Sequence, residues 1–193
     1  MDRLDRQLAF IAEIDRLKAV DRRISIIGGA RLENSAEHSW HLATMAELLV
    51  EYAPEHVDLQ RAQQMLLIHD IVEIDAGDTF AFDVAAQAGQ AERERAAAER
   101  LFGVLPEVLA RRFRELWEEF EAFETTTDRF AVDLDRFQAL LLNRANRGGT
   151  WHLHGVDRER VLKRMEPIRD AVPALWPVVL RTLDEVGLEA GLG

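Results

Sequence analysis

An apolar segment in the first half of the chain reads Met65-Leu66-Leu67-Ile68-His69-Asp70-Ile71-Val72-Glu73-Ile74 and continues with Asp75-Ala76-Gly77-Asp78. Seven of its first ten residues are large and apolar, which predicts an element buried in the core. The segment nevertheless contains His69, Asp70 and Glu73. A buried carboxylate without a partner is so unfavourable that it normally takes up a proton or binds a cation. We therefore expect a cation beside Asp70, and a metal ion is the simplest candidate.

This segment is predicted to lie on one helix that begins after Asp58 and ends at Gly77. Asp58 has the side chain of an N-cap, and glycine commonly ends a helix. One sector of the helical wheel contains Leu59, Ala62, Leu66, His69, Asp70 and Glu73. The three ionisable residues thus continue the apolar stripe of the helix. Asp78 follows directly at its C-terminal end.

The composition is typical of a soluble globular protein of one domain. The 193 residues are 48% hydrophobic and 31% charged, and they predict a single domain spanning residues 1–193. No apolar run of about 18 residues could cross a membrane, and the N-terminus lacks the apolar stretch of a secretion signal. We therefore expect a cytoplasmic protein without a membrane partner.

Cysteine content and charge narrow the possible functions. The chain has no cysteine, which excludes disulfides, thiolate nucleophiles and cysteine-ligated metal sites. Any metal must therefore bind to His, Asp and Glu side chains. The net charge of −11, without a dense Lys/Arg cluster in the sequence, argues against a nucleic acid polymer as partner. A small anionic ligand remains possible, because a bound cation and one or two arginines can reverse the local charge.

The first 35 residues predict a helix followed by a long loop. Large apolar residues recur at helical spacing, which predicts an amphipathic helix of about four turns whose apolar face packs in the core. These residues are Leu4, Leu8, Ile11, Ile14 and Leu17. The pattern then dissolves between Asp21 and Ser35 around Gly28-Gly29, which predicts a loop.

A second helix is predicted to begin after Asn34 and to carry a histidine into the core. Asn34 and Glu37 have the spacing of a capping box. His38 lies on the apolar face of this helix, and His41 lies at the edge of the same face. Taken alone, each fits a hydrogen-bonded core histidine better than a metal ligand.

The middle of the chain predicts three more helices. Residues 85–102 are rich in Ala, Glu and Arg, which is typical of a solvent-facing helix. Pro106 suits the first turn of the next helix, in which Trp117, Phe120 and Phe123 are expected to pack in the core. The segment Thr125-Thr126-Thr127-Asp128 is a stop and cap signal before a helix from Arg129 to about Asn146.

This last helix offers two acidic residues with different expected environments. Asp133 projects toward the side that holds Arg129 and Arg136, so we interpret it as a surface acid paired with arginines. Asp135 projects between Ala131 and Ala139 on an apolar side. Asp135 is therefore the expected inward carboxylate, with the same burial problem as Asp70.

The C-terminal part predicts a loop and two further helices. Gly148-Gly149 opens a loop with His152 and His154, which are expected to be surface or packing histidines rather than metal ligands. Asp157 caps the penultimate helix, and Pro173 opens the last. Because no strand pattern, internal repeat or linker is visible, the predicted fold is all-α, with no significant β-sheet.

Three separate helices are thus expected to bury ionisable side chains that could meet. They contribute His38, His69 with Asp70, and Asp135. Two imidazoles and two carboxylates are a suitable ligand set for a divalent transition metal and leave coordination positions for water and substrate. The set suits manganese, cobalt, iron, zinc, nickel or magnesium to different degrees, so the sequence predicts one divalent ion without naming it.

These residues carry a resemblance to a known family. The motifs Arg31-Leu32-Glu33-Asn34-Ser35-Ala36-Glu37-His38, His69-Asp70-Ile71-Val72-Glu73 with Gly77-Asp78, and Leu134-Asp135-Arg136 occur in this order. In this combination the chain resembles the HD-domain metal-dependent phosphohydrolases. It is most similar to their compact branch, which contains the 5′-deoxynucleotidases, and the resemblance extends from about Arg23 to Asn146.

The resemblance implies a fold, an activity and roles for residues. It implies a single HD-domain helical bundle that forms a homodimer and acts on a small nucleotide or other phosphate ester. The implied metal ligands are His38, His69, Asp70 and Asp135. The implied reaction removes phosphate from a (deoxy)nucleoside 5′-monophosphate, with Glu73 as the proton-handling acid, Asp78 near the reacting or sugar end, and Arg23 on the phosphate. Many members have a tryptophan after the arginine that matches Arg23, whereas this chain has Ile24, a difference that bears on the choice between deoxyribose and ribose.

The chemistry of the residues agrees with this reaction. A divalent metal activates water and polarises a phosphoryl oxygen, and Glu73 lies one helical turn from His69 and Asp70, where it can accept or donate a proton. Arg23 or Arg31 would neutralise charge on the phosphoryl oxygens. Glu73 could instead orient a ligand histidine. Hydrolysis of a nucleoside triphosphate or another phosphate ester is the enzymatic alternative, and a non-catalytic metal-containing nucleotide-binding module is the alternative from another class.

Overall fold

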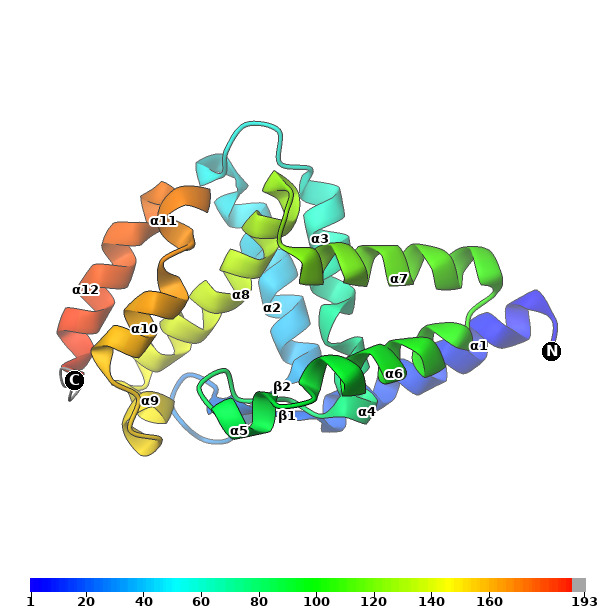
Figure 1. The fold of residues 1–193 in the computed structure, drawn as a ribbon, viewed down its shortest axis with the longest axis horizontal. Helices are drawn as coiled ribbons and strands as arrows, with labels where there is room; N and C mark the ends of the chain where they lie inside the picture. Colours follow the sequence, from blue (N-terminus) through cyan, green and yellow to red (C-terminus); the bar gives the residue numbers. More distant parts are fainter. Residues whose placement is uncertain (189–193) are drawn as a thin grey trace.

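The computed structural model describes residues 1–188 as an elongated bundle of helices with its termini at opposite ends (Figure 1). The α-helices are α1 (Arg3–Ile14), α2 (Ser35–Leu49), α3 (Leu59–Ile68), α4 (Glu73–Ala76), α5 (Val84–Gln87), α6 (Gln90–Gly103), α7 (Glu107–Ala122), α8 (Thr126–Ala145), α9 (Gly149–Leu153), α10 (Arg158–Met165), α11 (Ile168–Ala171) and α12 (Trp176–Val186). The 3₁₀ helices are η1 (Asp15–Ala19), η2 (Val50–Tyr52), η3 (His69–Val72) and η4 (Pro173–Leu175), and the strands are β1 (Asp21–Ser25) and β2 (Leu32–Asn34). The all-α prediction is confirmed, with two short strands as the only β-structure among the described residues.

The strands correct the prediction of a loop between Asp21 and Ser35. β1 and β2 pair antiparallel, with Asp21 opposite Asn34 and Ser25 opposite Leu32, and the register is irregular between these pairs. Gly28 has a φ of 90° in the turn between them, a conformation that favours glycine. Three to five residues with an irregular register are too few to produce a visible period of two in the sequence. The strand pair holds the backbone before α2 against the bundle.

α8 is the central element of the bundle. It crosses the molecule diagonally in Figure 1 and packs against α2, α3 and α7 on one side and against α10, α11 and α12 on the other. Its buried side chains include Phe130, Leu134 and Leu140, which are fully covered. Because helices from both halves of the chain contact α8, its residues can meet side chains from any of them. The helix begins at Thr126, three residues before the predicted start, and Thr125 forms the N-terminal capping box with Asp128.

The predicted helix starts at Asn34, Asp58 and Asp157 are confirmed. The Asn34 side chain accepts a hydrogen bond from the backbone N–H of Glu37, and the Glu37 side chain completes the capping box. The side chains of Asp58 and Asp157 each accept a hydrogen bond from the backbone N–H three residues later. These caps satisfy N–H groups that have no partner within the helix.

The predicted continuous helix between Asp58 and Gly77 is divided into three pieces. α3 ends at Ile68, η3 contains His69 and Asp70, and α4 contains Glu73. A 3₁₀ turn has three residues rather than 3.6, so it rotates the following side chains relative to an ideal wheel. Gly77, with a φ of 75°, ends α4 as predicted.

The N-terminal helix does not pack as predicted. Leu17 is buried and Ile14 is partly buried, but Leu4, Leu8 and Ile11 are 61%, 54% and 60% exposed. α1 lies alongside α6 at the end of the molecule that contains the N-terminus (Figure 1). This end offers one layer of helices to pack against, so α1 buries Phe10 on its inner face and leaves a stripe of apolar residues uncovered.

Two other segments differ from the predicted helices. Gly89 is in a left-handed conformation and divides the predicted helix over residues 85–102 into α5 and α6. The predicted loop around His152 and His154 is instead the short helix α9, whose Trp151 is buried. Trp117 and Phe120 are buried as predicted, whereas Phe123 is half-buried at the end of α7.

No helix within residues 1–188 is both long and apolar enough to cross a membrane. The predicted single domain over residues 1–193 stays a prediction, and residues 189–193 lie outside the described part.

Candidate metal centre

Three elements bring the predicted metal ligands together. His38 lies on α2, His69 and Asp70 on η3, and Asp135 on α8. Ligand atoms of His38, His69 and Asp135 all lie within 4.8 Å of one another. Nε2 of His38 is 2.9 Å from Oδ1 of Asp135, and Nε2 of His69 is 3.0 Å from Oδ1 of Asp70. His38, His69 and Asp135, from three elements far apart in sequence, therefore converge, and Asp70 lies beside them next to His69.

The outer ring nitrogens of both histidines face oxygen atoms. Nδ1 of His69 donates to the carbonyl oxygen of Leu66 at 2.9 Å, which leaves Nε2 for the centre. Nδ1 of His38 lies 3.3 Å from Oε2 of Glu33, a carboxylate that is 3% exposed. An oxygen behind a ligating imidazole fixes its orientation and tautomer.

The donor set fits a divalent metal ion. Nε2 of His69 is buried, and although Oδ1 of Asp70 lies 3.0 Å away, Nε2 makes no well-aligned hydrogen bond among the described residues. A buried polar atom of this kind normally has a partner, and here it faces two carboxylates. Two imidazole nitrogens and two carboxylates are a donor set that a divalent transition metal accepts. His38, His69, Asp70 and Asp135 are thus the residues that would hold the ion.

Arg22 lies beside these carboxylates and was not predicted to do so. One guanidinium nitrogen donates to Oδ2 of Asp70 at 2.9 Å, and another lies 3.5 Å from Oδ1 of Asp135. Burial alone would lower the pKa of Arg22, but Asp70 and Asp135 outweigh burial and raise it. Arg22 therefore supplies the positive charge that buried Asp70 requires. The burial of Asp70 alone does not indicate a metal ion, which is indicated instead by the set of two imidazoles and two carboxylates.

The charges of the centre hold both members of the His69–Asp70 pair ionised. Burial alone would lower the pKa of His69, but Asp70 and Asp135 outweigh it and raise the pKa to about 9. Burial would raise the pKa of Asp70, but His69 and Arg22 outweigh it and lower the pKa to about 2. A metal that binds here competes with a proton for His69, so its affinity falls at acidic pH.

Asp133 does not have the surface environment predicted for it, whereas Asp135 faces inward as predicted. Asp133 is fully buried and accepts a hydrogen bond from Arg136 at 2.6 Å, whereas the Asp135 side chain is 18% exposed. The prediction of Asp133 as a surface acid is wrong, although its pairing with an arginine is present. Both faces of α8 are covered by other helices, and Asp135 keeps some exposure because it faces a cavity.

A cavity of about 200 Å³ opens from the metal-ligand cluster. Its walls come from β1, η3, α4, α6, α7, α8, α9, α10 and the segment after Gly77. The lining residues that the sequence analysis named are His69, Asp70, Glu73, Asp78, Asp135, Arg23 and Ile24. Arg31 does not line it and instead pairs with Glu37 on the surface.

Glu73 and Asp78 both face this cavity as acids with raised pKa values. Burial and the nearby charge of Asp70 raise the pKa of Glu73 well above its ordinary value. The hydroxyl of Ser35 donates to Oε2 of Glu73 at 2.6 Å. Burial also raises the pKa of Asp78, whose Oδ2 accepts a hydrogen bond from the backbone N–H of Arg23 at 3.2 Å. A carboxyl group with a raised pKa can carry a proton near neutral pH.

Other polar residues of the site were missed by the sequence analysis. Glu121 lines the cavity. Glu33 is buried behind His38, and Gln138 donates to its Oε1 at 2.7 Å. Arg22 shares a face of β1 with buried Ile24, but the sequence did not indicate this, because β1 itself left no visible strand pattern. Glu121 carried no signal either, since it belongs to a strongly charged helix.

The remaining histidines lie outside the metal-ligand cluster. Nδ1 of His41 is 3.2 Å from Nε2 of Gln138. Gln138 in turn donates to Glu33, the carboxylate behind His38. His152 and His154 are exposed, and the His154 ring packs against Phe80 with the ring centres 4.8 Å apart. The prediction of His152 and His154 as surface or packing residues agrees with these positions.

A bundle of helices with a buried His/Asp cluster at its centre defines the class of this protein as a helical domain with a candidate metal site. A family model described as HD domain matches residues 14–176. The match covers most of the chain, and the protein therefore belongs to the HD domain family. The resemblance inferred from the sequence motifs is confirmed.

The chain is also similar to individual proteins of known name. It is 29% identical to the 5'-deoxynucleotidase HDDC2 of Bos taurus over 135 residues, which are 69% of this chain and 64% of that protein. The HDDC2 protein of Xenopus laevis is 30% identical over 135 residues, which are 69% of this chain and 66% of that protein. The chain thus spans about two thirds of the length of these relatives.

Two solved structures share the fold. The crystal structure of a predicted metal-dependent phosphohydrolase from Magnetospirillum magnetotacticum superposes with a TM-score of 0.93 at 49% identity, covering 98% of this chain and 96% of that chain. A conserved hypothetical protein from Pyrococcus furiosus superposes with a TM-score of 0.63 at 22% identity, covering 90% of this chain and 99% of that chain, which is a likeness of fold. The fold is therefore shared over nearly the whole chain.

Proposed function

We propose that the chain is a metal-dependent phosphohydrolase that removes phosphate from (deoxy)nucleoside 5′-monophosphates. The observation that carries the proposal is the cluster of His38, His69 and Asp135 at the end of a cavity, with Asp70 and Arg22 beside it. The donors suit a divalent metal, and the arginine suits a phosphoryl group. The names of the HDDC2 relatives and of the Magnetospirillum protein support the same chemistry.

The residues of the site have distinct proposed roles. His38, His69, Asp70 and Asp135 hold one divalent ion, which when bound supplies activated water and polarises the phosphoryl oxygen. Glu73, which accepts a hydrogen bond from the Ser35 hydroxyl, accepts or donates the proton that is transferred in the reaction. Arg22 is proposed in place of Arg23 and Arg31 as the residue that neutralises the phosphate, because its guanidinium lies at the ligand carboxylates.

Asp78 and the residues beside Arg22 are proposed to contact the sugar. Asp78 lines the cavity together with Arg23 and Ile24. Arg23 and Ile24 lie on β1, the strand that also contains Arg22. Many members of the family have a tryptophan directly after the phosphate-binding arginine. If that arginine is Arg22, the residue at the tryptophan position is Arg23, whereas it would be Ile24 if the arginine were Arg23. The choice between deoxyribose and ribose should therefore be tested at Arg23 as well as at Ile24.

The test of this function is the variant Asp70→Ala. We expect it to lose bound metal, measured by elemental analysis, and to lose at least about a hundredfold in phosphate release from deoxynucleoside monophosphates. Asp75→Ala, which removes a surface carboxylate paired with Arg100, is the matched control and should retain both metal and activity. Full turnover by an Asp70→Ala protein without metal would contradict the assignment.

The alternatives differ in the product that they release. A nucleoside triphosphate or other phosphate-ester hydrolase would prefer substrates other than the monophosphates, and a comparison of phosphate with triphosphate release separates these activities. A non-catalytic nucleotide-binding module would bind nucleotide and metal without turnover. The acids Glu73 and Asp78, which exceed the needs of a structural metal site, favour the enzyme.

Metal identity, assembly and location remain part of the proposal. The ion is proposed to be manganese, cobalt, iron, zinc, nickel or magnesium, and elemental analysis of the purified protein would name it. The proposed homodimer is supported by the uncovered apolar stripe of α1. The cytoplasmic location stays a prediction.

A further inference from the structure

A second concave surface lies next to the cavity and has a different character. This basic groove, of about 470 Å³, lies between α5, α8 and α10. It is lined by Ala81, Phe82, Val84, Gln87, Arg136, Arg160, Lys163, Arg164 and Pro167. Ala81, Phe82 and Arg164 also line the cavity, so these three residues form the partition between the two spaces.

The charge of the basic groove is opposite to that of the whole chain. Four of its nine lining residues are cationic and none is acidic, although the chain carries a net charge of −11. Arg136 is paired with Asp133, which is buried behind it. Within residues 1–188, Arg160, Lys163 and Arg164 have no carboxylate within salt-bridge distance. Three unneutralised cations on one wall make a local field that attracts anions.

Two of these cations are held in position by the protein. Arg160 donates to the carbonyl oxygen of Phe82 at 2.6 Å, and its guanidinium lies 5.4 Å from the centre of the Phe82 ring. Arg164 is half-buried in the partition, where burial lowers its pKa. A guanidinium that is partly removed from water without a paired carboxylate is stabilised when an anion binds to it.

Apart from Gln87, the other residues that line the groove are apolar. Phe82, Val84 and Pro167 face the cations, and Val84 is 78% exposed. We propose that the basic groove binds a phosphorylated organic anion of the nucleotide class, separately from the substrate in the cavity. Its phosphates would contact Arg160, Lys163 and Arg164, and its organic part would pack on the apolar wall. Because Arg160 holds Phe82 in the partition, occupancy of this groove is expected to influence the neighbouring cavity.

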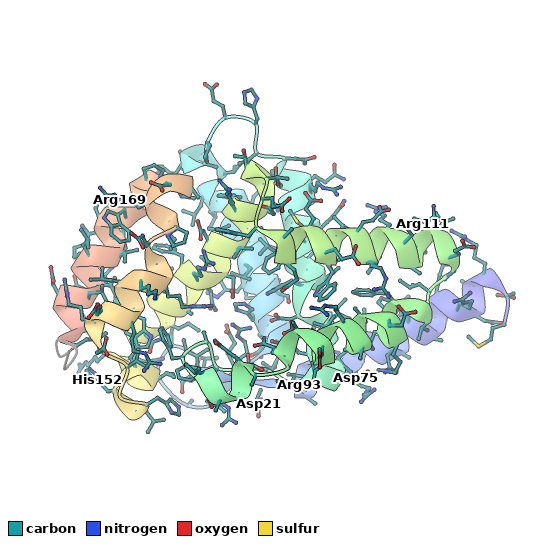
Figure 2. The ribbon with its side chains drawn as sticks, in the orientation of Figure 1. Asp21, Asp75, Arg93, Arg111, His152 and Arg169 are labelled. Atoms are coloured by element: carbon teal, nitrogen blue, oxygen red, sulfur yellow. The ribbon has the colours of Figure 1, made fainter. Side chains whose placement is uncertain are left out.

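The test uses ADP as the probe in calorimetric titrations of the full chain at low ionic strength. The variant Arg160→Ala/Lys163→Ala is expected to weaken ADP binding by at least about tenfold. The matched control Arg158→Ala/Arg169→Ala also removes two positive charges, but neither residue lines the basic groove. Arg158 pairs with Asp184, and Arg169 is a surface residue labelled in Figure 2. This control should bind ADP like the parent protein. Equal weakening in both variants would indicate general charge attraction and would overturn the proposal.

Two further titrations separate this site from the cavity and from a site for inorganic anions. Asp70→Ala, which alters the cavity, should still bind ADP, and this result does not depend on whether the protein is a phosphohydrolase. Loss of ADP binding in Asp70→Ala would place the nucleotide in the cavity and overturn the proposal. Inorganic pyrophosphate should bind more weakly than ADP, and equal affinity would exclude a contribution from the apolar wall.

Discussion

Arg22 and Arg23 are neighbours in sequence with different surroundings. The Arg22 side chain is 13% exposed and lies against Asp70 and Asp135, whereas Arg23 is exposed and donates its backbone N–H to Asp78. Alternation along β1 accounts for the difference, because successive side chains point to opposite faces of a strand. Two adjacent arginines therefore offer a matched pair of substitutions.

We expect Arg22→Gln to lower kcat/KM for a nucleoside monophosphate by about 10²–10³-fold, the effect of removing one preorganised donor from developing charge. Arg22→Lys should recover part of this loss, because lysine retains the charge but not the planar fork of donors. Arg23→Gln, which removes the neighbouring charge proposed to lie at the sugar and not at the phosphate, should change kcat/KM less than about tenfold. Steady-state kinetics would contradict the assignment if Arg23→Gln had the larger effect.

Burial of Asp133 should make the free energy of unfolding decrease as the pH rises. Burial raises its pKa to about 6, although Arg136 opposes the shift. An acid with a raised pKa in the folded state binds protons more tightly when folded, so its contribution to stability falls as pH rises from about 4 to 6. Relative to Asp133→Asn, the native protein should gain on the order of 2 kcal/mol in unfolding free energy between pH 7 and pH 4.5.

Urea denaturation of both proteins at the two pH values measures this difference. Asp15→Asn provides a control, because Asp15 is exposed and has no burial cost. A difference between native protein and Asp133→Asn that stays constant with pH, or that changes with the opposite sign, would contradict the explanation.

At the scale of elements, the junction between α8 and α9 depends on a glycine. Gly148 has a φ of 85°, and a Cβ atom there would lie 2.4 Å from the His152 ring and 2.6 Å from Cγ1 of Val186. α9 contributes Thr150 and Trp151 to the cavity, and the Thr150 hydroxyl donates to the carbonyl oxygen of Arg23 at 3.0 Å. The glycine thus positions one wall of the site.

Gly148→Ala is expected to destabilise the protein by about 2–3 kcal/mol, through backbone strain and through displacement of His152 and Val186. Gly155→Ala is the matched control, because Gly155 has a φ of 60° but no atom within 4 Å of the added Cβ. It should cost only the strain of about 1 kcal/mol. Chemical denaturation measures both values, and equal losses would show that the predicted contacts are relieved without cost.

At the scale of the whole molecule, the stripe of Leu4, Leu8 and Ile11 on α1 is the feature that the proposed homodimer would cover. We expect light scattering to give twice the chain mass of 22.0 kDa. Leu8→Glu should give the mass of one chain, because it introduces a charge into the apolar stripe. Leu153→Glu, at an exposed position on α9, should leave the dimer intact. A single-chain mass for the native protein, or no effect of Leu8→Glu, would contradict this interface.

Sequence by itself determined the helical class, the capped starts of helices and the four candidate ligands. Helix caps depend on residues three positions apart, and the inward placement of His38 depends on the period of one helix, so both are local properties. The order of His38, His69-Asp70 and Asp135 along the chain was enough to indicate the HD domain family. These predictions required no knowledge of how helices pack against one another.

Tertiary structure decided the exposure and the partners of the same side chains. The helical wheel identified two faces of α8 but could not tell that helices cover both, so Asp133 was placed at the surface. It likewise predicted the apolar face of α1 without indicating that its Leu8 has no neighbour to cover it. Arg22 meets Asp70 across 48 positions of sequence, and the basic groove combines residues of α8 and α10. Burial, ion pairing and cavity shape depend on contacts between distant segments, and the period of a single helix contains no information about them.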